Sequence, residues 1–457
     1  MIAVVFALPG ASGAQAAGLH PQLLTRAGYG TEPIGFARTV DGRLHVAYET
    51  NTSWGNAASG IAEQAISPSG HPGPAVQALA WGGPNAGSPN GVPGLAVLPS
   101  GVLQAVFGGS PSGVEGPWGI SSSDGGATWS APVNVGSGIM PFADSNLTLQ
   151  VSQGTPVLTA GCCGNVVVQR GFGPGAPTAQ VTTAADGAAG NTASALDAKT
   201  GAVVASWDSN AGSGGIWLQQ IAPTIGAAQK APIPSQFGTG EPLILAGRDS
   251  GPGVFGAYAA DAGPTTHVRL LRYGGGSVAV GSVKGLRAPV VGVATGPDGR
   301  IWVMWAGQVN GTGVTAVTRS NRAVTRFEPI QTHRATWSSL FTLSGDGRLG
   351  PLDMLMSAVS APKSGPFVNG IYYARVLPRL SATVSAKKVA TGKYKLTAKV
   401  TDAGDAASGA TVAAKGQSKT TNSKGATSIT LAGSGGDHVN VAVTKPGYAE
   451  LTLRVSL

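Results

Sequence analysis

Charged and aromatic residues are scarce in this chain. Only 11% of its 457 residues are Asp, Glu, Lys or Arg, less than half the ordinary share of about 25%, and 6% are aromatic. It has no strict glycine period and no heptad repeat, which excludes collagen-like and coiled-coil chains. The composition also argues against a disordered chain, because 42% of the residues are hydrophobic and can offset the entropy cost of ordering.

Long apolar runs are also missing. Residues 1–8 form a short apolar stretch, and Ala14-Gln15-Ala16 matches a signal-peptidase cleavage pattern, although no Lys or Arg precedes it. This predicts a signal peptide over residues 1–16, with a buried first strand as the alternative. No later run reaches the roughly 18 residues of a spanning helix. We therefore expect an exported protein without a transmembrane segment, either secreted or associated with the cell surface.

Cysteine and metal-ligand motifs are nearly absent. The two cysteines, Cys162 and Cys163, are adjacent, so they form no disulfide framework for the fold. They form either a vicinal disulfide, which the flanking glycines would accommodate, or two free thiols. The six histidines are dispersed and no H-E-x-x-H or C-x-x-C spacing occurs, so we expect no metal and no cofactor.

Basic charge is concentrated at the C-terminus. Residues 381–457 hold nine of the thirteen lysines and Arg454, against four acidic residues. This step in composition predicts a domain boundary near Arg379, with one domain over 17–380 and a smaller one over 381–457. The basic module could dock on an anionic cell-wall polymer. Nucleic acid fits less well, because arginines are not interleaved with aromatic residues.

What the chain has in abundance is glycine, 71 residues, and an internal repeat. An apolar strand, an Asp-Gly turn and an alternating strand recur clearly at residues 40–48, 297–305 and 345–353. Weaker copies bring the number to seven, at steps near fifty residues. Asp-Gly supplies the positive φ of tight hairpins, and strict alternation indicates strands with two different faces.

This repeat predicts an all-β fold. Four short strands per fifty residues are typical of a β-propeller, here seven-bladed, or alternatively six-bladed. The seventh copy ends after its third strand, so we expect residues 19–33 to supply its outer strand and close the ring. Residues 381–457 predict a small β-sandwich of short alternating strands.

One local motif is more specific than the others. Residues 122–129, Ser-Ser-Asp-Gly-Gly-Ala-Thr-Trp, match the Asp box S-x-D-x-G-x-T-W. On this motif the chain resembles the sialidase-like, Asp-box (BNR) propeller superfamily, in which the box is a turn between a blade's third and fourth strands. The resemblance implies structural roles for its residues, which are Ser122, Asp124, Gly126, Thr128 and Trp129. Residues 421–425 and 445–448 likewise resemble bacterial Ig-like and carboxypeptidase-regulatory-like modules.

The sialidase resemblance implies a set of catalytic groups: three arginines that grip a carboxylate, a tyrosine nucleophile assisted by a glutamate, and an aspartate as acid and base. The spacing of that family is not reproduced. In this chain the candidates for such a catalytic set are Arg38, Arg287, Arg334, Tyr372, Tyr373 and Glu49. Ordinary solvated or paired side chains are the alternative interpretation of each.

Loops that join second to third strands should open on one face of the propeller. Asn, Asp and exposed Trp in such loops suit sugars, through directional hydrogen bonds and stacking. The ligand-binding candidates are Trp54, Trp118, Asn51, Asp208 and Asn310. We therefore expect a monomer that binds a glycan or glycoconjugate. An exo-acting glycoside hydrolase of sialidase type and an extracellular protein-interaction scaffold are the alternatives.

Overall fold

The structure is a computed structural model of the chain. It describes residues 21–26, 34–50, 60–80, 90–109, 116–136, 147–162, 165–173, 175–181, 192–209, 215–232, 243–262, 264–335, 337–360 and 368–457. In these ranges regular structure is nearly all β, and the single helix among them is the 3₁₀ turn η1 (Pro297–Gly299). The strands form four-stranded antiparallel sheets, each made mostly of consecutive strands.

Seven of these sheets, named sheet one to sheet seven in chain order, lie between residues 22 and 376. Sheets one and two comprise β2 (Gly35–Arg38), β3 (Leu44–Glu49), β4 (Gly60–Ile66) and β5 (Pro72–Ala80), then β6 (Asn90–Val97), β7 (Leu103–Gly109), β8 (Gly116–Ser122) and β9 (Val133–Asn134). Sheets three and four comprise β10 (Leu147–Ser152), β11 (Thr155–Cys162), β12 (Asn165–Arg170) and β13 (Thr178–Val181), then β14 (Thr192–Leu196), β15 (Val203–Ser209), β16 (Gly215–Ala222) and β17 (Gln229–Lys230).

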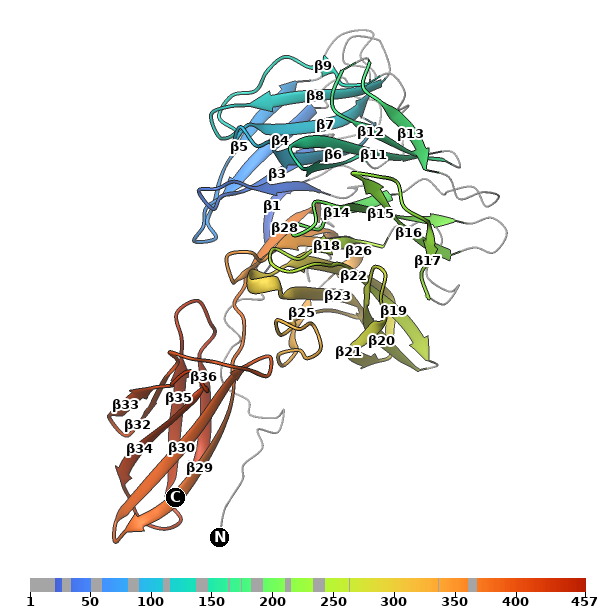
Figure 1. Cartoon of the computed structure of the whole chain (residues 1–457). Helices are drawn as coiled ribbons and strands as arrows, with labels where there is room; N and C mark the ends of the chain where they lie inside the picture. The colour runs from blue at the N-terminus through green and yellow to red at the C-terminus, as the bar shows by residue number, and fades with distance from the viewer. Residues whose placement is uncertain are drawn as a thin grey trace.

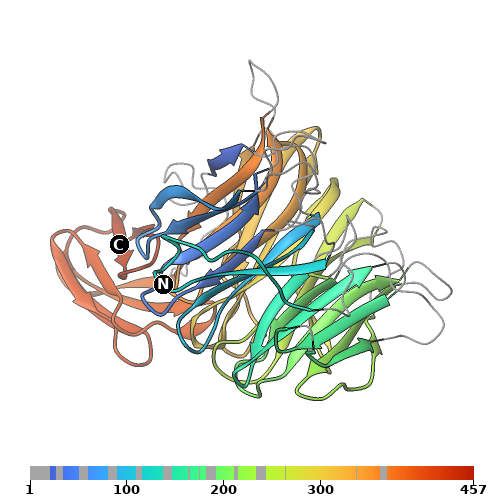
Figure 2. The same ribbon diagram turned by 90° about the horizontal axis from the view of Figure 1, so that it is seen from above.

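The remaining three follow the same order. Sheets five and six comprise β18 (Leu245–Gly247), β19 (Val254–Ala262), β20 (Thr265–Arg272) and β21 (Ser277–Lys284), then β22 (Leu286–Thr295), β23 (Ile301–Val309), β24 (Thr312–Arg319) and β25 (Gln331–Ala335). Sheet seven comprises β26 (Trp337–Asp346), β27 (Leu352–Ser360), β28 (Val368–Val376) and β1 (Gln22–Arg26). Figures 1 and 2 show these sheets fanned around one axis, the arrangement of a β-propeller.

The last sheet is completed from the other end of the chain. Strand β1 pairs antiparallel with β28, so that Gln22 lies opposite Tyr373 and Arg26 opposite Gly370. This confirms the prediction that residues before the first repeat supply the missing outer strand. The pairing joins the N-terminal segment to the last sheet and removes an exposed sheet edge.

Neighbouring sheets pack face to face through apolar side chains. Between sheets six and seven, Trp302 and Met304 contact the inward side chains of Leu352 and Met356, all with no exposed surface. Alternation with period two places these residues on one face, as the repeat predicts. Burying a side chain such as Phe107 of sheet two contributes about 2 kcal/mol.

Glycine lets the innermost strands approach one another. A Cβ at Gly94 of β6 would lie 2.9 Å from the carbonyl oxygen of Leu147 in β10. A Cβ at Gly292 of β22 would overlap the carbonyl oxygen of Leu343 in β26. The abundance of glycine therefore has a packing reason at the axis, separate from its role in turns.

Two further sheets form the C-terminal module. One contains β29 (Ser381–Ala390), β30 (Lys393–Asp402), β31 (Asp405–Ala406) and β34 (Ala426–Ala432), and the other contains β33 (Gln417–Thr420), β32 (Thr411–Ala414), β35 (His438–Thr444) and β36 (Leu451–Ser456). Their inner faces share one core, in which Leu396 and Val400 of the first sheet are buried with Val412 and Val441 of the second.

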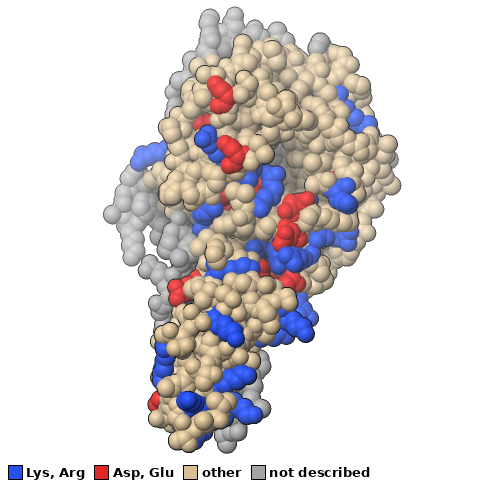
Figure 3. All heavy atoms as spheres, turned by 60° about the vertical axis from the view of Figure 1, so that its left-hand side comes forward, with Lys and Arg blue, Asp and Glu red and all other residues tan. Residues whose placement is uncertain are grey.

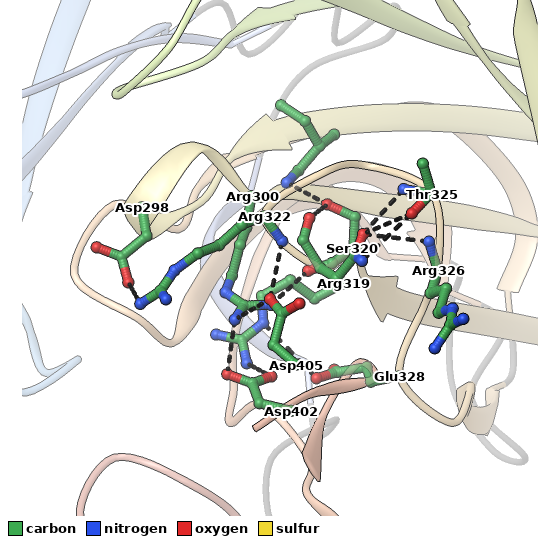
Figure 4. A network of polar contacts seen from close by, with 12 residues as sticks. Asp298, Arg300, Arg319, Ser320, Arg322, Thr325, Arg326, Glu328, Asp402 and Asp405 are labelled. Carbon is green, nitrogen blue, oxygen red and sulfur yellow. Dashed lines mark hydrogen bonds and ion pairs between the residues drawn. The ribbon is translucent and has the colours of Figure 1, made fainter. Parts of the chain in front are cut away.

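The module joins the propeller at sheet six. Arg319 at the end of β24 donates to Asp402 at 2.6 Å, and Arg300 donates to Asp405 at 2.9 Å. The Arg319 guanidinium also lies 5.3 Å from the ring centre of Tyr448. Figure 4 shows Arg300 and Arg319 of the propeller converging with Asp402 and Asp405 of the module. The module is thus held by buried charge pairs as well as by the covalent link.

Candidate ligand-binding site

A cavity of about 530 Å³ lies on the axis of the propeller. Its wall is built from the first strands of all seven sheets, β2, β6, β10, β14, β18, β22 and β26, and from the residues that follow some of them. This volume is within the range of about 300–1,000 Å³ that small-molecule sites occupy. Because it is framed by sheet backbone, the cavity is preformed.

Hydroxyl and amide groups line the middle of this axial cavity. Thr148 of β10 and Ser194 of β14 lie within 2.6 Å of each other, oxygen to oxygen. Gln150 donates from Nε2 to the Ser194 carbonyl oxygen at 3.1 Å, which leaves its side-chain carbonyl oxygen outside that bond. These contacts cross from sheet three to sheet four and fix the direction of each polar group. Fixed donors and acceptors of this kind recognise hydroxyl-rich ligands.

Charged side chains gather at the end of the cavity where the first strands finish. Arg38 at the end of β2 donates from Nε to Asp346 and from Nη2 to Asp353, each at 2.6 Å. All three side chains are buried. Burial lowers the pKa of Arg38, but the two carboxylates outweigh it and leave that pKa above its ordinary value. Arg38 therefore stays charged and joins sheet one to sheet seven.

Of the three arginines that line the cavity, Arg38, Arg248 and Arg348, the most exposed is Arg348. It donates from Nε to Asp346 at 2.6 Å, while 44% of its side chain remains exposed. Arg248, in the wall of sheet five, donates instead to the carbonyl oxygens of Gly299 at 2.8 Å and Arg322 at 2.6 Å. Burial, followed by repulsion from Arg272, lowers the pKa of Arg248. Of these two, Arg348 has the freer guanidinium for a ligand.

Three polar residues at the same end tie sheets three, four and five each to the following sheet. Asp197 accepts a hydrogen bond from the Gly253 amide at 2.8 Å, and Asp249 accepts one from the Gly299 amide at 2.5 Å. Ser152 donates to the Gly201 carbonyl oxygen at 2.5 Å. The sequence analysis did not single out these residues. Their signal is positional, because each stands at or just after the end of a first strand and reaches the turn of the following sheet.

The three arginines proposed for an anion site are not brought together. Arg287 is exposed at the start of β22, eight residues before Thr295, which corresponds to about 26 Å of strand. Arg334 is exposed on β25, the outer strand of the same sheet. Arg38 lies at the opposite end of the propeller, where the first strands turn into the second, and forms ion pairs with two carboxylates. The three side chains therefore do not converge on one site, because Arg38 occupies the last position of its strand.

The tyrosine candidates lie between sheets. Tyr373 donates to Asp353 at 2.7 Å and is 1% exposed, and burial raises its pKa well above the ordinary value. Tyr372 donates to the Val368 carbonyl oxygen at 3.1 Å and packs edge-on against Trp337. Burial raises the pKa of Tyr372 too. Both phenols are therefore protonated packing residues, while Glu49 is half-buried at the end of β3.

The loop candidates have mixed outcomes. Trp118 is 8% exposed and donates from its indole nitrogen to the Gly109 carbonyl oxygen at 3.0 Å, so it is a core residue and not a stacking surface. Asn310 is exposed, with a φ of 51° in the turn between β23 and β24. Asp208 lies in β15 opposite Ile216. Trp54, Asn51 and Cys163 lie outside the described residues, and Cys162 ends β11.

The Ser122–Trp129 segment forms a closed turn between β8 and β9. Asp124 accepts from the Thr128 hydroxyl at 2.6 Å, from the Thr128 amide at 2.9 Å and from Ser122 at 2.8 Å. These bonds, those of Thr128 first, lower the pKa of Asp124 to about 2. The Gly126 amide donates to Ser122, and the indole of Trp129 donates to the Gly126 carbonyl oxygen. The side chains of Ser122, Asp124, Thr128 and Trp129 are thus all hydrogen-bonded within the turn.

Within the described ranges, no three His, Cys, Asp or Glu side chains are grouped so that they could hold a metal ion. The same part of the chain contains no helix with the length and apolar character needed to cross a bilayer.

Comparisons with known proteins find likeness only to solved structures. No family model and no curated protein matches the chain. The Hadza microbial sialidase Hz136 has 12% identity and a TM-score of 0.43, over 75% of this chain and 65% of that one. The NanB sialidase of Streptococcus pneumoniae has 8% identity and a TM-score of 0.44, over 78% and 70%. The α-L-arabinanase of Penicillium chrysogenum has 12% identity and a TM-score of 0.39, over 78% and 98%.

Proposed function

We propose that the propeller binds a glycan or glycoconjugate and that the axial cavity is part of its binding site. The observation that carries this proposal is the preformed cavity of about 530 Å³, with Thr148, Gln150 and Ser194 held in fixed directions by contacts between sheets. Hydroxyl and amide groups match sugar hydroxyls, and Arg348 at one end adds affinity for a ligand with a carboxylate.

Binding is favoured over hydrolysis by the places of the catalytic candidates. Retaining hydrolysis of the sialidase type needs a tyrosine nucleophile open to the substrate and arginines that converge on one carboxylate. Tyr372 and Tyr373 are buried, and Arg38 lies at the other end of the propeller from Arg287. Incubation with a fluorogenic sialoside between pH 4 and pH 8 tests this choice, since turnover by clean protein would reverse it.

The domain organisation that supports this function is also part of the proposal. We infer seven blades, from the seven described sheets and the β1–β28 pairing, within residues 17–380. We assign residues 381–457 to an Ig-like sandwich, because two sheets share one core. Residues 1–16 are assigned to a signal peptide, and the mature protein to the extracellular space or the cell surface, as a monomer. N-terminal sequencing of the secreted protein tests the cleavage site.

A glycan array probed with the full chain tests the binding proposal. For a glycan that binds, Gln150→Ala and Arg348→Gln should each weaken affinity about five- to tenfold, the value of one lost hydrogen bond to a ligand. Arg43→Gln is the matched control, because Arg43 is an exposed arginine at the same end of the propeller that does not line the cavity. Binding that is unchanged in both cavity variants would remove the cavity from the site, and an array without any bound glycan would favour a protein-interaction scaffold.

A further inference from the structure

On one sheet face of the C-terminal module the charged and polar side chains are all lysine, serine or threonine, and alanines occupy the remaining positions. On β30 the exposed positions alternate with buried ones, and the exposed side chains are Lys393, Lys395, Thr397 and Lys399. Directly opposite on β29 lie Lys387 beside Lys395, Ser385 beside Thr397 and Thr383 beside Lys399. On the other side β34 adds Ser428 and Thr430. We call this surface, made of Thr383, Ser385, Lys387, Lys393, Lys395, Thr397, Lys399, Ser428 and Thr430, the lysine face.

Docking of the module leaves its free surface still more basic. Two of its four acidic residues, Asp402 and Asp405, face the propeller and pair with Arg319 and Arg300. Of the other two, Asp437 lies 3.8 Å from Lys415. In Figure 3 lysine and arginine recur along the module, whereas acidic residues lie mainly near its junction with the propeller. The lysine face itself contains no acidic residue.

This arrangement opposes stability. Lys387 and Lys395 stand directly opposite in the antiparallel pair, and like charges in such a pair repel each other. Lys393 and Lys395 point to the same side about 7 Å apart along the strand. No lysine of this face has a carboxylate within salt-bridge distance among the described residues. A row of uncompensated charges on a rigid sheet is what a multivalent anion neutralises.

We propose that the lysine face binds a linear acidic polysaccharide laid along β30. The extended sheet surface suits an extended chain, the lysines pair with its repeated carboxylates, and the interleaved Ser and Thr hydroxyls bond to its sugar hydroxyls. A lipid surface could also accept hydrogen bonds from these hydroxyls, so the alignment of Lys393, Lys395 and Lys399 along one strand is what favours a linear polymer over a bilayer. This site is separate from the axial cavity, so it does not depend on the function proposed for the propeller.

The test is binding of the full chain to immobilised polygalacturonate. Lys395→Gln combined with Lys399→Gln should weaken binding about tenfold at low salt, because two ion pairs to the polymer are lost. The matched control combines Lys419→Gln and Lys424→Gln, which removes the same charge from exposed positions outside the lysine face. That control should change binding less than about twofold. All four lysines are exposed, so neither double variant should unfold below the wild-type temperature, and loss of the Lys387–Lys395 repulsion should slightly raise the unfolding temperature of the Lys395→Gln and Lys399→Gln variant.

Three results would overturn the proposal: an equal loss in the two double variants, no binding of polygalacturonate by the wild type, or capture by phosphatidylglycerol vesicles that exceeds capture by the polymer. The Gln150→Ala variant separates this site from the propeller, because it should bind polygalacturonate as the wild type does whatever happens to its glycan binding.

Discussion

Arg319 of the propeller and Asp402 of the C-terminal module form a 2.6 Å ion pair in which both side chains are buried. The Tyr448 hydroxyl donates to the second oxygen of Asp402 at 2.7 Å, and Arg300 lies 3.3 Å from that oxygen. Arg319 also lies over the Trp302 ring at 5.4 Å, and Trp302 belongs to the core between sheets six and seven. The module is therefore anchored in the propeller core, and the two parts should unfold together.

Asp402→Ala tests this coupling. It leaves Arg319 without its closest carboxylate, and removing one member of a buried pair costs about 3–5 kcal/mol. We expect the free energy of unfolding to fall by about 3 kcal/mol and the single calorimetric transition to split into two. Asp437→Ala is the control, because the Asp437–Lys415 pair is exposed and worth less than about 1 kcal/mol. A single unshifted transition in Asp402→Ala would contradict the coupling.

Glu328, at the same junction, should make the stability of the protein depend on pH. Burial raises the pKa of Glu328 to about 7, despite the opposing effects of Arg319 and of the Arg379 amide. The other charged group near it is Asp402, which raises the pKa further. The pKa of Glu328 is therefore higher in the folded state, about 7, than in the unfolded state, 4.5. Between pH 4.5 and about pH 7 the folded protein keeps the Glu328 proton, whereas the unfolded chain has released it. Stability should therefore fall as pH rises from about 4.5 to about 7.

Glu328→Gln tests this direction. The amide keeps an acceptor oxygen for the Arg379 N–H and carries no charge, so the variant should lose this part of the slope. Measured by urea unfolding at several pH values, the variant should gain about 2 kcal/mol relative to wild type between pH 4.5 and pH 8. Glu450→Gln, at an exposed position, should follow the wild-type curve. If the free energies of unfolding of the wild type and of Glu328→Gln differ by the same amount at every pH, Glu328 is not the group that causes the pH dependence.

The repeat in the sequence predicted the propeller because turn chemistry and alternation are local. Gly42, Gly101 and Gly299 all adopt φ between 73° and 86°, which the Asp-Gly and related turns require. The β1–β28 pairing was also predictable, since an incomplete last repeat leaves one edge to be filled. The turn at residues 122–129 was predictable from its pattern because the hydrogen bonds of its side chains close within eight residues.

The site was less predictable, because its contacts join residues far apart in the sequence. Arg38 was a candidate for an anion site with Arg287 and Arg334, but its place at the strand end brings it to Asp346 and Asp353, more than 300 positions away. Nothing in the local pattern around Trp118 distinguishes a core tryptophan from an exposed one. The Arg319–Asp402 pair, separated by 83 positions, likewise has no periodic signal.

Gly292 tests the packing of the first strands. Its replacement by Ala would place a methyl group against the Leu343 carbonyl oxygen of the next sheet, where backbone cannot yield as a side chain can. We expect a loss of about 1–3 kcal/mol in the free energy of unfolding, within the range of overpacked cores. Gly276→Ala is the matched control, because a Cβ there would meet no atom within 4 Å. Equal stability of the two variants would show that the strands can separate without cost.

Arg38 provides the corresponding test at the place where sheet one meets sheet seven. Arg38→Met keeps much of the side-chain volume but leaves Asp346 and Asp353 buried without their shared cation, although Arg348, Arg375 and Tyr373 still donate to them. We expect the free energy of unfolding to fall by about 3 kcal/mol, the cost of removing one member of a buried charge cluster. Arg43→Met, at an exposed arginine five residues on, should stay within about 0.5 kcal/mol of wild type. Chemical denaturation at pH 7 separates the two variants, and an Arg38→Met variant that is as stable as Arg43→Met would mean that the pairing of Arg38 with Asp346 and Asp353 does not stabilise this junction.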